Sequence, residues 1–445
     1  MPENKKERPQ DPEIQRLTGE IETAKKEGNY SRLKELFPQL ANRQLAVGEA
    51  PRALTWINEG IEAAKGEGDQ FTAARLAGLK GMALRQIGNP QQALRAYKRS
   101  ERIARTLGHS PILMDALTQR GKIFAEQGKF DQAVPPLEEA YRMAFKEGDG
   151  PREMFLAGLQ GDTYLAMEQQ GKAMEFYTIG LEKAQELNRL EAQCSYQIAI
   201  GKIYLELEEF QPAENHFKQA LDLGGRLKHP GYEFQAFENL LLMSIRQNDL
   251  ERAKIYGEQS VRLAREIEDL AAEASSISDL ADFLILKGEY QKALEYLGRG
   301  LELAEQAHDQ EWQLKMIANQ GIANYYLDET QMAEGLIERA LEMALHLDKS
   351  FEAVILRSQL SAIKADLGKL EESLQVAQKT LEMAEEQELS LVVGDQKVLI
   401  GLNYYELGNP QKAVGYLKEA VEIYREMNRE DLVRKTEGYL NEIAP

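Results

Sequence analysis

A short turn recurs at a constant interval along this chain, as at Gly48, Gly88 and Gly128, and a small residue follows each turn at a fixed distance. The fifth residue after each turn start is alanine, except for Ser373 in the ninth repeat. A fixed period of this length is typical of a solenoid, in which one supersecondary unit stacks on the next. We therefore expect one continuous body over residues 11–445, although length alone would suggest about three domains. The turns start at Gly48, Gly88, Gly128, Glu168, Glu208, Asn248, Gly288, Asp328, Gly368 and Gly408.

Each period predicts two helices joined by the turn. In residues 70–109, apolar side chains recur at helical spacing up to Gly88, which ends the first helix. Asn89 is expected to cap the second helix, and Pro90 suits its first position because the missing N–H has no helical partner there. Ten such periods predict ten antiparallel helix pairs, an all-α fold.

Small residues recur at one position of each helix. Glycine inside a helix costs about 1 kcal/mol relative to alanine, so its recurrence at one phase indicates close helix–helix packing. Gly321 is one such expected contact, and Leu241 is the exception. The small residues of the first helices are Ala41, Gly81, Gly121, Gly161, Gly201, Ala281, Gly321, Ser361 and Gly401, and those of the second helices run from Gly60 to Ala420.

The chain ends are expected to cap the array. Asp11-Pro12 opens a lone helix to about Lys26, and Asn428 is expected to cap a last helix at about 429–443. Residues 1–10 are expected to be a disordered tail. Gly224-Gly225 and His229-Pro230-Gly231 interrupt the pattern at 224–231, which indicates either a tolerated loop or a bend.

The motif of a small residue, an aromatic three residues later, and then Ala-x3-aromatic resembles the tetratricopeptide repeat. Gly161-x2-Tyr164 with Ala173-x3-Tyr177 is a good local example. The usual repeat has 34 residues and ends in proline, whereas this one has 40 and lacks that proline. It is similar to the longer variant of Pins-type adaptors, kinesin light chains and maltose-type activator arms. The resemblance implies a right-handed superhelix over about residues 11–445.

Composition excludes several classes of function. The net charge is −19, and residues 151–445 contribute −22 of it. An acidic body repels nucleic acids and anionic membranes and favours a basic or amphipathic partner, although acidity also serves solubility. No apolar run is long enough to span a membrane, and the N-terminus does not resemble a secretory signal. A single cysteine, Cys194, fits a core position in a cytoplasmic protein.

Catalytic and metal-binding motifs are absent from the sequence. There is no phosphate-binding loop, dinucleotide-binding glycine cluster, HExxH, CxxC or GxSxG. The five histidines are scattered, and none lies three or four residues from another. We expect no catalytic residue, no metal site and no cofactor, and so no enzyme.

The candidate partner site follows from the resemblance, which implies that the residue after the small position of each first helix points into a concave groove. The groove positions in the first half of the chain are polar, and those in the second half are mostly apolar, as expected of a surface that binds a peptide or helix. The alternative is that these side chains pack between neighbouring helices. These positions are Asn42, Met82, Lys122, Asp162, Lys202, Leu242, Asp282, Ile322, Ala362 and Leu402, with neighbouring positions Arg75, Arg85, Glu126, Ile245, Ile285, Tyr325, Tyr326 and Tyr405.

Two further features bear on the partner. Where the chaperone type of carboxylate clamp would recur, the chain has Thr118, Gly158 and Ile198, so chaperone-tail binding is not expected. The second repeat is basic, from Arg75 to Arg105, which indicates either a solvated face or a site for an acidic peptide or for the protein's own acidic half.

The sequence thus predicts a non-catalytic scaffold that binds a protein segment in its groove. The alternatives are a regulatory arm that senses a small ligand or peptide, and a protein that assembles with itself.

Overall fold

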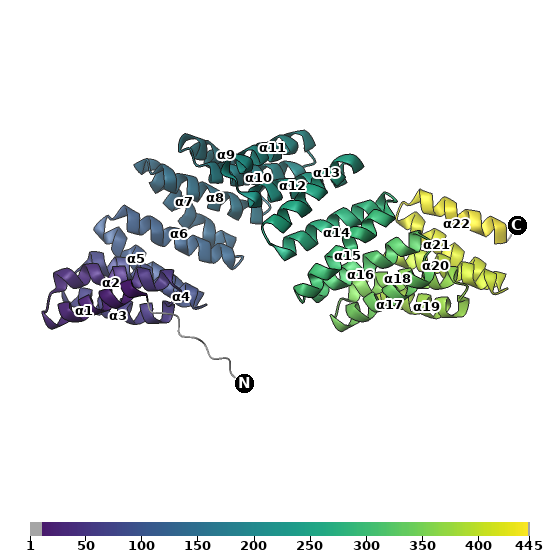
Figure 1. The fold of residues 1–445 in the computed structure, drawn as a ribbon, viewed down its shortest axis with the longest axis horizontal. Coiled ribbons are helices and arrows are strands. Elements are labelled where there is room, and N and C mark those ends of the chain that lie inside the picture. Colours follow the sequence, from purple (N-terminus) through teal and green to yellow (C-terminus); the bar gives the residue numbers. More distant parts are fainter. Residues whose placement is uncertain (1–10, 444–445) are drawn as a thin grey trace. The chain divides into compact units, whose positions relative to one another are not determined.

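A computed structural model describes residues 11–443, which form 22 α-helices and no strand (Figure 1). The predicted all-α class is confirmed, with a lone first helix, paired helices and a lone last helix. The expected tail at 1–10 lies outside the described residues. The chain divides into two compact units, which we call unit 1 (residues up to Glu209) and unit 2 (from Phe210). The right-handed superhelix stays a prediction.

The helices of unit 1 are α1 Pro12–Lys26, α2 Tyr30–Ala46, α3 Ala50–Gly66, α4 Gln70–Gln86, α5 Pro90–Leu107, α6 Ser110–Glu126, α7 Phe130–Glu147, α8 Gly150–Ala166, α9 Gln170–Glu186 and α10 Leu190–Glu206. Those of unit 2 are α11 Phe210–Leu227, α12 Pro230–Arg246, α13 Leu250–Glu266, α14 Leu270–Leu286, α15 Tyr290–Gln306, α16 Gln310–Tyr326, α17 Thr330–His346, α18 Ser350–Asp366, α19 Leu370–Glu386, α20 Ser390–Glu406, α21 Pro410–Glu426 and α22 Glu430–Ile443.

Left-handed residues occur at a constant interval, half the length of the repeat, from Gly28 to Asn428. Each one ends a helix and turns the backbone into the next. The sequence pattern identified the turns within pairs, and the turns between pairs, such as Gly68 and Lys228, have the same backbone geometry. Glycine adopts positive φ without strain, but more than half of these positions hold another residue.

The expected helix caps are confirmed where Asn precedes Pro. The side chain of Asn89 accepts a hydrogen bond from the backbone N–H of Gln92 at 3.3 Å, and Asn409 does the same with Lys412. The expectation for Asn428 is wrong: with φ at 57° it is the left-handed residue that ends α21, and the last helix begins only at Glu430.

The small positions lie at close helix contacts, as predicted. A Cβ built on Gly161 would lie 2.4 Å from the ring of Tyr177, and one on Gly321 would lie 2.6 Å from Cδ1 of Ile337. Leu241 is the large residue at the small position of α12, and the facing helix α13 has a small residue in return. Gly257 of α13 occupies the repeat position that holds Tyr177 or Ile337 in other repeats. Both members of that pair are buried, so the large and small positions are exchanged in this repeat.

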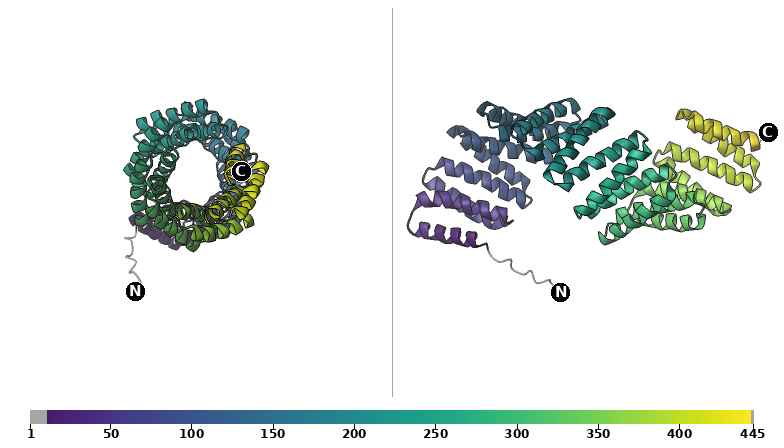
Figure 2. Two further views of the ribbon diagram at one scale, coloured as in Figure 1. Left: turned by 90° about the vertical axis from the view of Figure 1, so that its right-hand side faces the viewer. Right: turned by 45° about the horizontal axis from the view of Figure 1, so that its top comes forward.

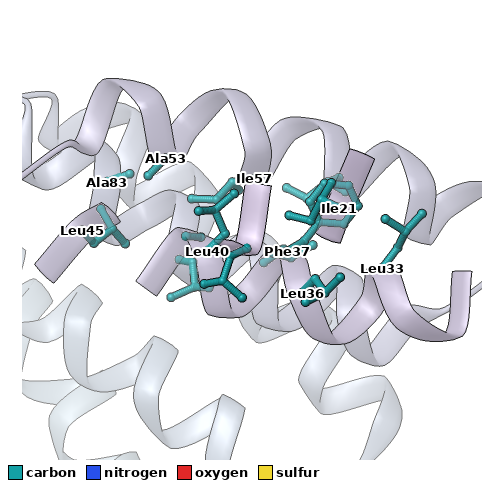
Figure 3. Packing of buried hydrophobic residues seen from close by; sticks show 14 of the residues in the cluster. Ile21, Leu33, Leu36, Phe37, Leu40, Leu45, Ala53, Ile57 and Ala83 are labelled. Atoms are coloured by element: carbon teal, nitrogen blue, oxygen red, sulfur yellow. The ribbon is translucent and has the colours of Figure 1, made fainter. Parts of the chain in front are cut away.

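The core of unit 1 begins with α1 to α4. Figure 3 shows Ile21 of α1, Phe37 and Leu40 of α2 and Ile57 of α3 pointing toward one another, all at most 1% exposed. Each helix thus buries one face against the helix before it and the helix after it, as a stacked array requires.

Within each unit, even-numbered helices also touch the next even-numbered helix, as α2, α4, α6 and α8 do in unit 1 and α12, α14 and α16 do in unit 2. Figures 1 and 2 show this side-by-side stacking inside each unit. We call the exposed surface of the even-numbered helices of a unit its inner face.

The irregular stretch at 224–231 is local in structure. Helix α11 continues through Gly224-Gly225 to Leu227, and α12 begins at Pro230. A Cβ on Gly224 would lie 2.9 Å from Cγ of Glu233, so this glycine permits a close approach of α11 and α12. The bend stays a prediction.

Candidate functional site

The predicted groove residues all lie on even-numbered helices, but the structure divides them between the two inner faces. Those of unit 1 are Asn42, Arg75, Met82, Arg85, Lys122, Glu126, Asp162 and Lys202, and those of unit 2 are Leu242, Ile245, Asp282, Ile285, Ile322, Tyr325, Tyr326, Ala362, Leu402 and Tyr405.

A pocket of about 410 Å³, which we call the unit 1 pocket, lies on α2, α4, α6 and α8, and Tyr97 and Ser100 of α5 also line it. It brings Asn42 and Arg75 together with the exposed side chains of Met82 and Phe155. The guanidinium of Arg75 makes no ion pair or hydrogen bond with any other residue between 11 and 443. This pocket therefore combines the exposed apolar surface of Met82 and Phe155 with the unpaired guanidinium of Arg75.

The other predicted residues of unit 1 lie outside this pocket. Arg85 pairs with Glu126 and donates a hydrogen bond to Gln119 at 3.3 Å. The ammonium of Lys122 lies 5.7 Å from the ring centre of Phe155.

Asp162 accepts a hydrogen bond from the hydroxyl of Tyr177 at 2.7 Å. Lys202 is exposed on α10. Arg85 and Asp162 are thus already engaged by the protein's own side chains.

In unit 2, a pocket of about 430 Å³ on α16, α18, α20 and α22 brings five predicted residues together, Ala362 among them, and we call it the α16–α22 pocket. Ile322, Tyr325, Tyr326 and Leu402 form part of its wall, and Tyr326 is 55% exposed. The ring of Tyr326 stacks at 5.0 Å on that of Tyr290 from α15. This part of the wall is thus apolar and aromatic, and polar residues such as Asp395, Gln396 and Lys435 complete it.

Tyr325 is held in place by an acidic neighbour. Its hydroxyl donates a hydrogen bond to Asp366 of α18. Burial and this bond raise the pKa of Tyr325 to about 12, so the hydroxyl remains a donor at neutral pH. Asp366 in turn places a carboxylate beside the exposed aromatic surface.

A second pocket of unit 2, of about 510 Å³, lies on α16 and α18, and we call it the α16–α18 pocket. It shares Ile322 and Gln359 with the α16–α22 pocket. Trp312, Ile355 and the 53% exposed Phe351 form much of its wall. The two pockets together make one apolar strip on the inner face of unit 2.

Five predicted residues of unit 2, including Ile245 of α12 and Ile285 of α14, lie outside both pockets. Leu242 on α12 and Tyr405 on α20 are exposed. Asp282 on α14 pairs with Lys315 at 3.4 Å and accepts a hydrogen bond from Asn319.

Sequence reasoning missed a large part of each pocket wall because it read mainly one position per repeat. The walls also use the positions seven and three residues earlier, so that the three are spaced i, i+4 and i+7 on one helix face. In α18, for instance, they are Ile355, Gln359 and Ala362, and α16 contributes Lys315 and Ile322. Other missed wall residues are Tyr97, Asp115, Gln119, Arg152, Phe155, Trp312, Lys349, Phe351, Asp395, Gln396, Leu399, Lys435 and Tyr439.

Other chemistry was sought over residues 11–443. No three His, Cys, Asp or Glu side chains in this range come together as a metal site would need. None of the helices in this range has the length and apolar character to cross a bilayer. Cys194 is fully buried on α10, and burial raises its pKa to about 11, which confirms a core role rather than a reactive thiol.

Comparison with known families gives one consistent result. Models of the tetratricopeptide repeat match residues 69–144, 195–223, 274–311 and 351–426. The matches at 69–144, 274–311 and 351–426 each cover helices that the structure pairs, whereas the match at 195–223 runs over the boundary between the two units.

Among curated proteins, the chain is similar to outer dynein arm-docking complex subunit 4. The Bos taurus protein is 27% identical over 161 residues, which cover 36% of this chain and 23% of that protein. The Homo sapiens protein is 26% identical over 142 residues, 32% of this chain and 21% of that protein. The chain thus spans less than a quarter of the length of these relatives.

Solved structures show the same fold. A signal transduction ATPase of Pyrococcus horikoshii with a tetratricopeptide repeat sensor matches with a TM-score of 0.56 and 15% identity, over 82% of this chain and 56% of that one. The apo form of the quorum sensor NprR from B. thuringiensis matches with a TM-score of 0.51 and 15% identity, over 78% and 97%.

Proposed function

Because the chain is a tetratricopeptide repeat protein, we propose that it is a non-catalytic scaffold that binds a segment of a partner protein on the inner face of unit 2. The observation that carries this proposal is the apolar strip formed by the α16–α22 and α16–α18 pockets. Tyr326 and Phe351 each leave more than half of their surface exposed there. Exposed aromatic side chains lining a concave surface are typical of a binding site.

The charge of unit 2 selects the kind of partner. Residues 210–445 carry 25 basic and 42 acidic side chains, a net charge of −17, against 29 and 31 in residues 1–209. Asp366 and Asp395 stand at the edge of the strip. We therefore expect an amphipathic partner segment whose apolar side chains fill the pockets and whose basic residues meet these carboxylates.

A selection from displayed random peptides tests this proposal with the full chain as bait. The selected peptides are expected to combine apolar and basic residues. Their affinity is then measured by calorimetry for Tyr325→Ala with Leu402→Ala and for Lys122→Ala with Lys202→Ala. Truncating buried anchors commonly costs about 2 kcal/mol or more, roughly 30-fold in affinity, so the first pair should weaken binding strongly at any salt concentration.

The lysine pair lies in unit 1 and should change the affinity little. If it carries the affinity instead, the partner binds unit 1 and the proposal is wrong. Since Tyr325 also bonds Asp366, its loss could lower stability, and Tyr326→Ala gives a second variant at an exposed position. Both variants are compared with the parent by thermal melting. The ligand-sensing arm and the self-assembling protein stay predictions.

A further inference from the structure

One buried tyrosine of unit 1 has a hydroxyl group without a partner. Five tyrosines are buried in residues 11–443, and four of them donate a hydrogen bond to an acceptor of the protein. Tyr97 is only 2% exposed, and its hydroxyl bonds no other described residue. The four bonded pairs are Tyr164 with Glu138 at 3.0 Å, Tyr177 with Asp162 at 2.7 Å, Tyr196 with the backbone oxygen of Met154 at 2.6 Å, and Tyr424 with Asp395 at 2.6 Å.

Comparison with an equivalent repeat shows which hydrogen-bond acceptor Tyr97 lacks. Tyr97 and Tyr177 occupy the same position two repeats apart, and each packs on a glycine of the preceding helix, Gly81 or Gly161. The residue after Gly161 is Asp162, which accepts the hydroxyl of Tyr177. The residue after Gly81 is Met82, which has no oxygen to offer. The second repeat therefore has the donor of this pair and lacks its carboxylate.

The hydroxyl of Tyr97 is a donor at neutral pH. Burial raises the pKa of Tyr97, so the hydroxyl keeps its proton. A buried donor left unpaired costs roughly 1–3 kcal/mol, and Tyr97 is one of the residues that line the unit 1 pocket.

Charges of both signs line the same pocket, and one of them has no partner in the described part of the chain. Arg152 is already neutralised, because it pairs with Asp149 at 2.6 Å and with Asp115 at 3.4 Å. The guanidinium of Arg75 has no ion-pair or hydrogen-bond partner in the described part of the chain. A carboxylate that accepts hydrogen bonds from Tyr97 and Arg75 would satisfy both groups at once.

We propose that the unit 1 pocket binds an acidic side chain of a peptide, whose neighbouring apolar side chain rests on Met82 and Phe155. The carboxylate accepts the hydroxyl of Tyr97 as Asp162 accepts that of Tyr177 two repeats later. This site lies on a different unit from the proposed scaffold surface and selects the opposite charge, so the two can fail independently.

The test uses the full chain and two arrays of 12-residue peptides, acetylated and amidated so that no terminal charge remains. One array has a central Glu flanked by all pairs of apolar residues, and the other has Gln in its place. We expect binding to the Glu peptides and at least about tenfold weaker binding to the Gln peptides, as the loss of a charge-assisted hydrogen bond predicts. Equal binding to both arrays, or binding to neither, overturns the proposal.

Two variants separate binding from folding. Tyr97→Phe removes an unpaired hydroxyl, so the melting temperature should not fall, while affinity for the Glu peptides should drop about fivefold. Tyr177→Phe is the matched control: it removes a bonded hydroxyl, so stability should fall and peptide binding should not change. If Tyr97→Phe lowers the melting temperature or leaves the affinity unchanged, the hydroxyl does not serve a ligand and the proposal is wrong.

A second pair of variants tests the charge. Arg75→Gln should abolish the preference for Glu over Gln, whereas Arg95→Gln removes the same charge from an exposed position on α5 and should preserve it. If the free chain forms dimers that Arg75→Gln dissolves, the carboxylate comes from a second copy of the protein, and the peptide proposal is overturned.

Discussion

The close contact at Gly321 predicts an unusual response to a single methyl group. Elsewhere in a helix, Gly→Ala stabilises by about 1 kcal/mol because alanine has the better helix propensity. At Gly321 the new Cβ would lie 2.6 Å from Cδ1 and 2.8 Å from Cγ1 of Ile337, whereas carbon atoms prefer about 3.5–4.0 Å. Overpacking of this kind costs about 1–3 kcal/mol. Gly321→Ala should therefore destabilise by about 0–2 kcal/mol, and Gly321→Leu by more.

Gly335 provides the control in the same repeat. It is exposed on α17, and a Cβ there would meet no atom within 4 Å. Gly335→Ala should stabilise by about 1 kcal/mol, so that the two alanine variants differ by about 1–3 kcal/mol. Urea unfolding monitored by circular dichroism measures both, and the slope against urea shows whether the array still unfolds as one unit.

Ile337→Val completes the test, because it removes Cδ1, the nearest atom to the new methyl group. On its own it should cost about 0.5–1.5 kcal/mol. Combined with Gly321→Ala it should cost less than the sum of the two, a coupling of at least about 0.5 kcal/mol. If Gly321→Ala stabilises as Gly335→Ala does, the reasoning on close packing is refuted.

Three further predictions concern single side chains of unit 2. Glu388→Gly should stabilise by about 0.5–1 kcal/mol in urea unfolding, because φ is +56° there, whereas Gly368→Ala, at +72°, should destabilise by about 1–2 kcal/mol. Lys364→Ala should cost about 3 kcal/mol in the same assay, since this buried ammonium serves three carboxylates, one of them Glu334. Hydrogen bonds from Lys364 and Lys369 lower the pKa of Glu334 below its ordinary value of 4.5. The contribution of Glu334 to the free energy of unfolding is therefore complete above pH 4.5 and is lost as the pH falls below that value. Glu334→Gln should reduce the decrease of the melting temperature with falling pH.

The repeat made most of the fold predictable from sequence. A constant spacing fixes the phase of every helix, so Gly161 and Gly321 could be assigned to close contacts without any structure. The role of Asn428 was missed because Asn favours both an N-cap and a left-handed turn, and local sequence does not separate the two. The boundary between the units follows Glu208, a left-handed turn residue like its neighbours, and no composition change marks it.

The candidate site was predictable only in part. The positions after the small residues led to Ile322 and Leu402, and the neighbouring positions led to Arg75 and Tyr325. Tyr97 was missed because it lies on an odd-numbered helix, and its ring reaches the inner face only across the bare backbone at Gly81. Which hydroxyl lacks an acceptor depends on side-chain positions in three dimensions, and sequence periodicity does not give them.

The even spacing of the left-handed turns gives the chain a simple rule for changing its length. Excising one whole period between two turns, for instance from Gly88 to Gly128 within unit 1, joins backbone of the same conformation and returns every later helix to its former face. Excising half a period would join equally good turns, yet it would move the small position of each following helix out of register with its neighbour. Gain or loss of whole pairs is therefore the tolerated step, and the number of binding positions can vary without redesign of the core.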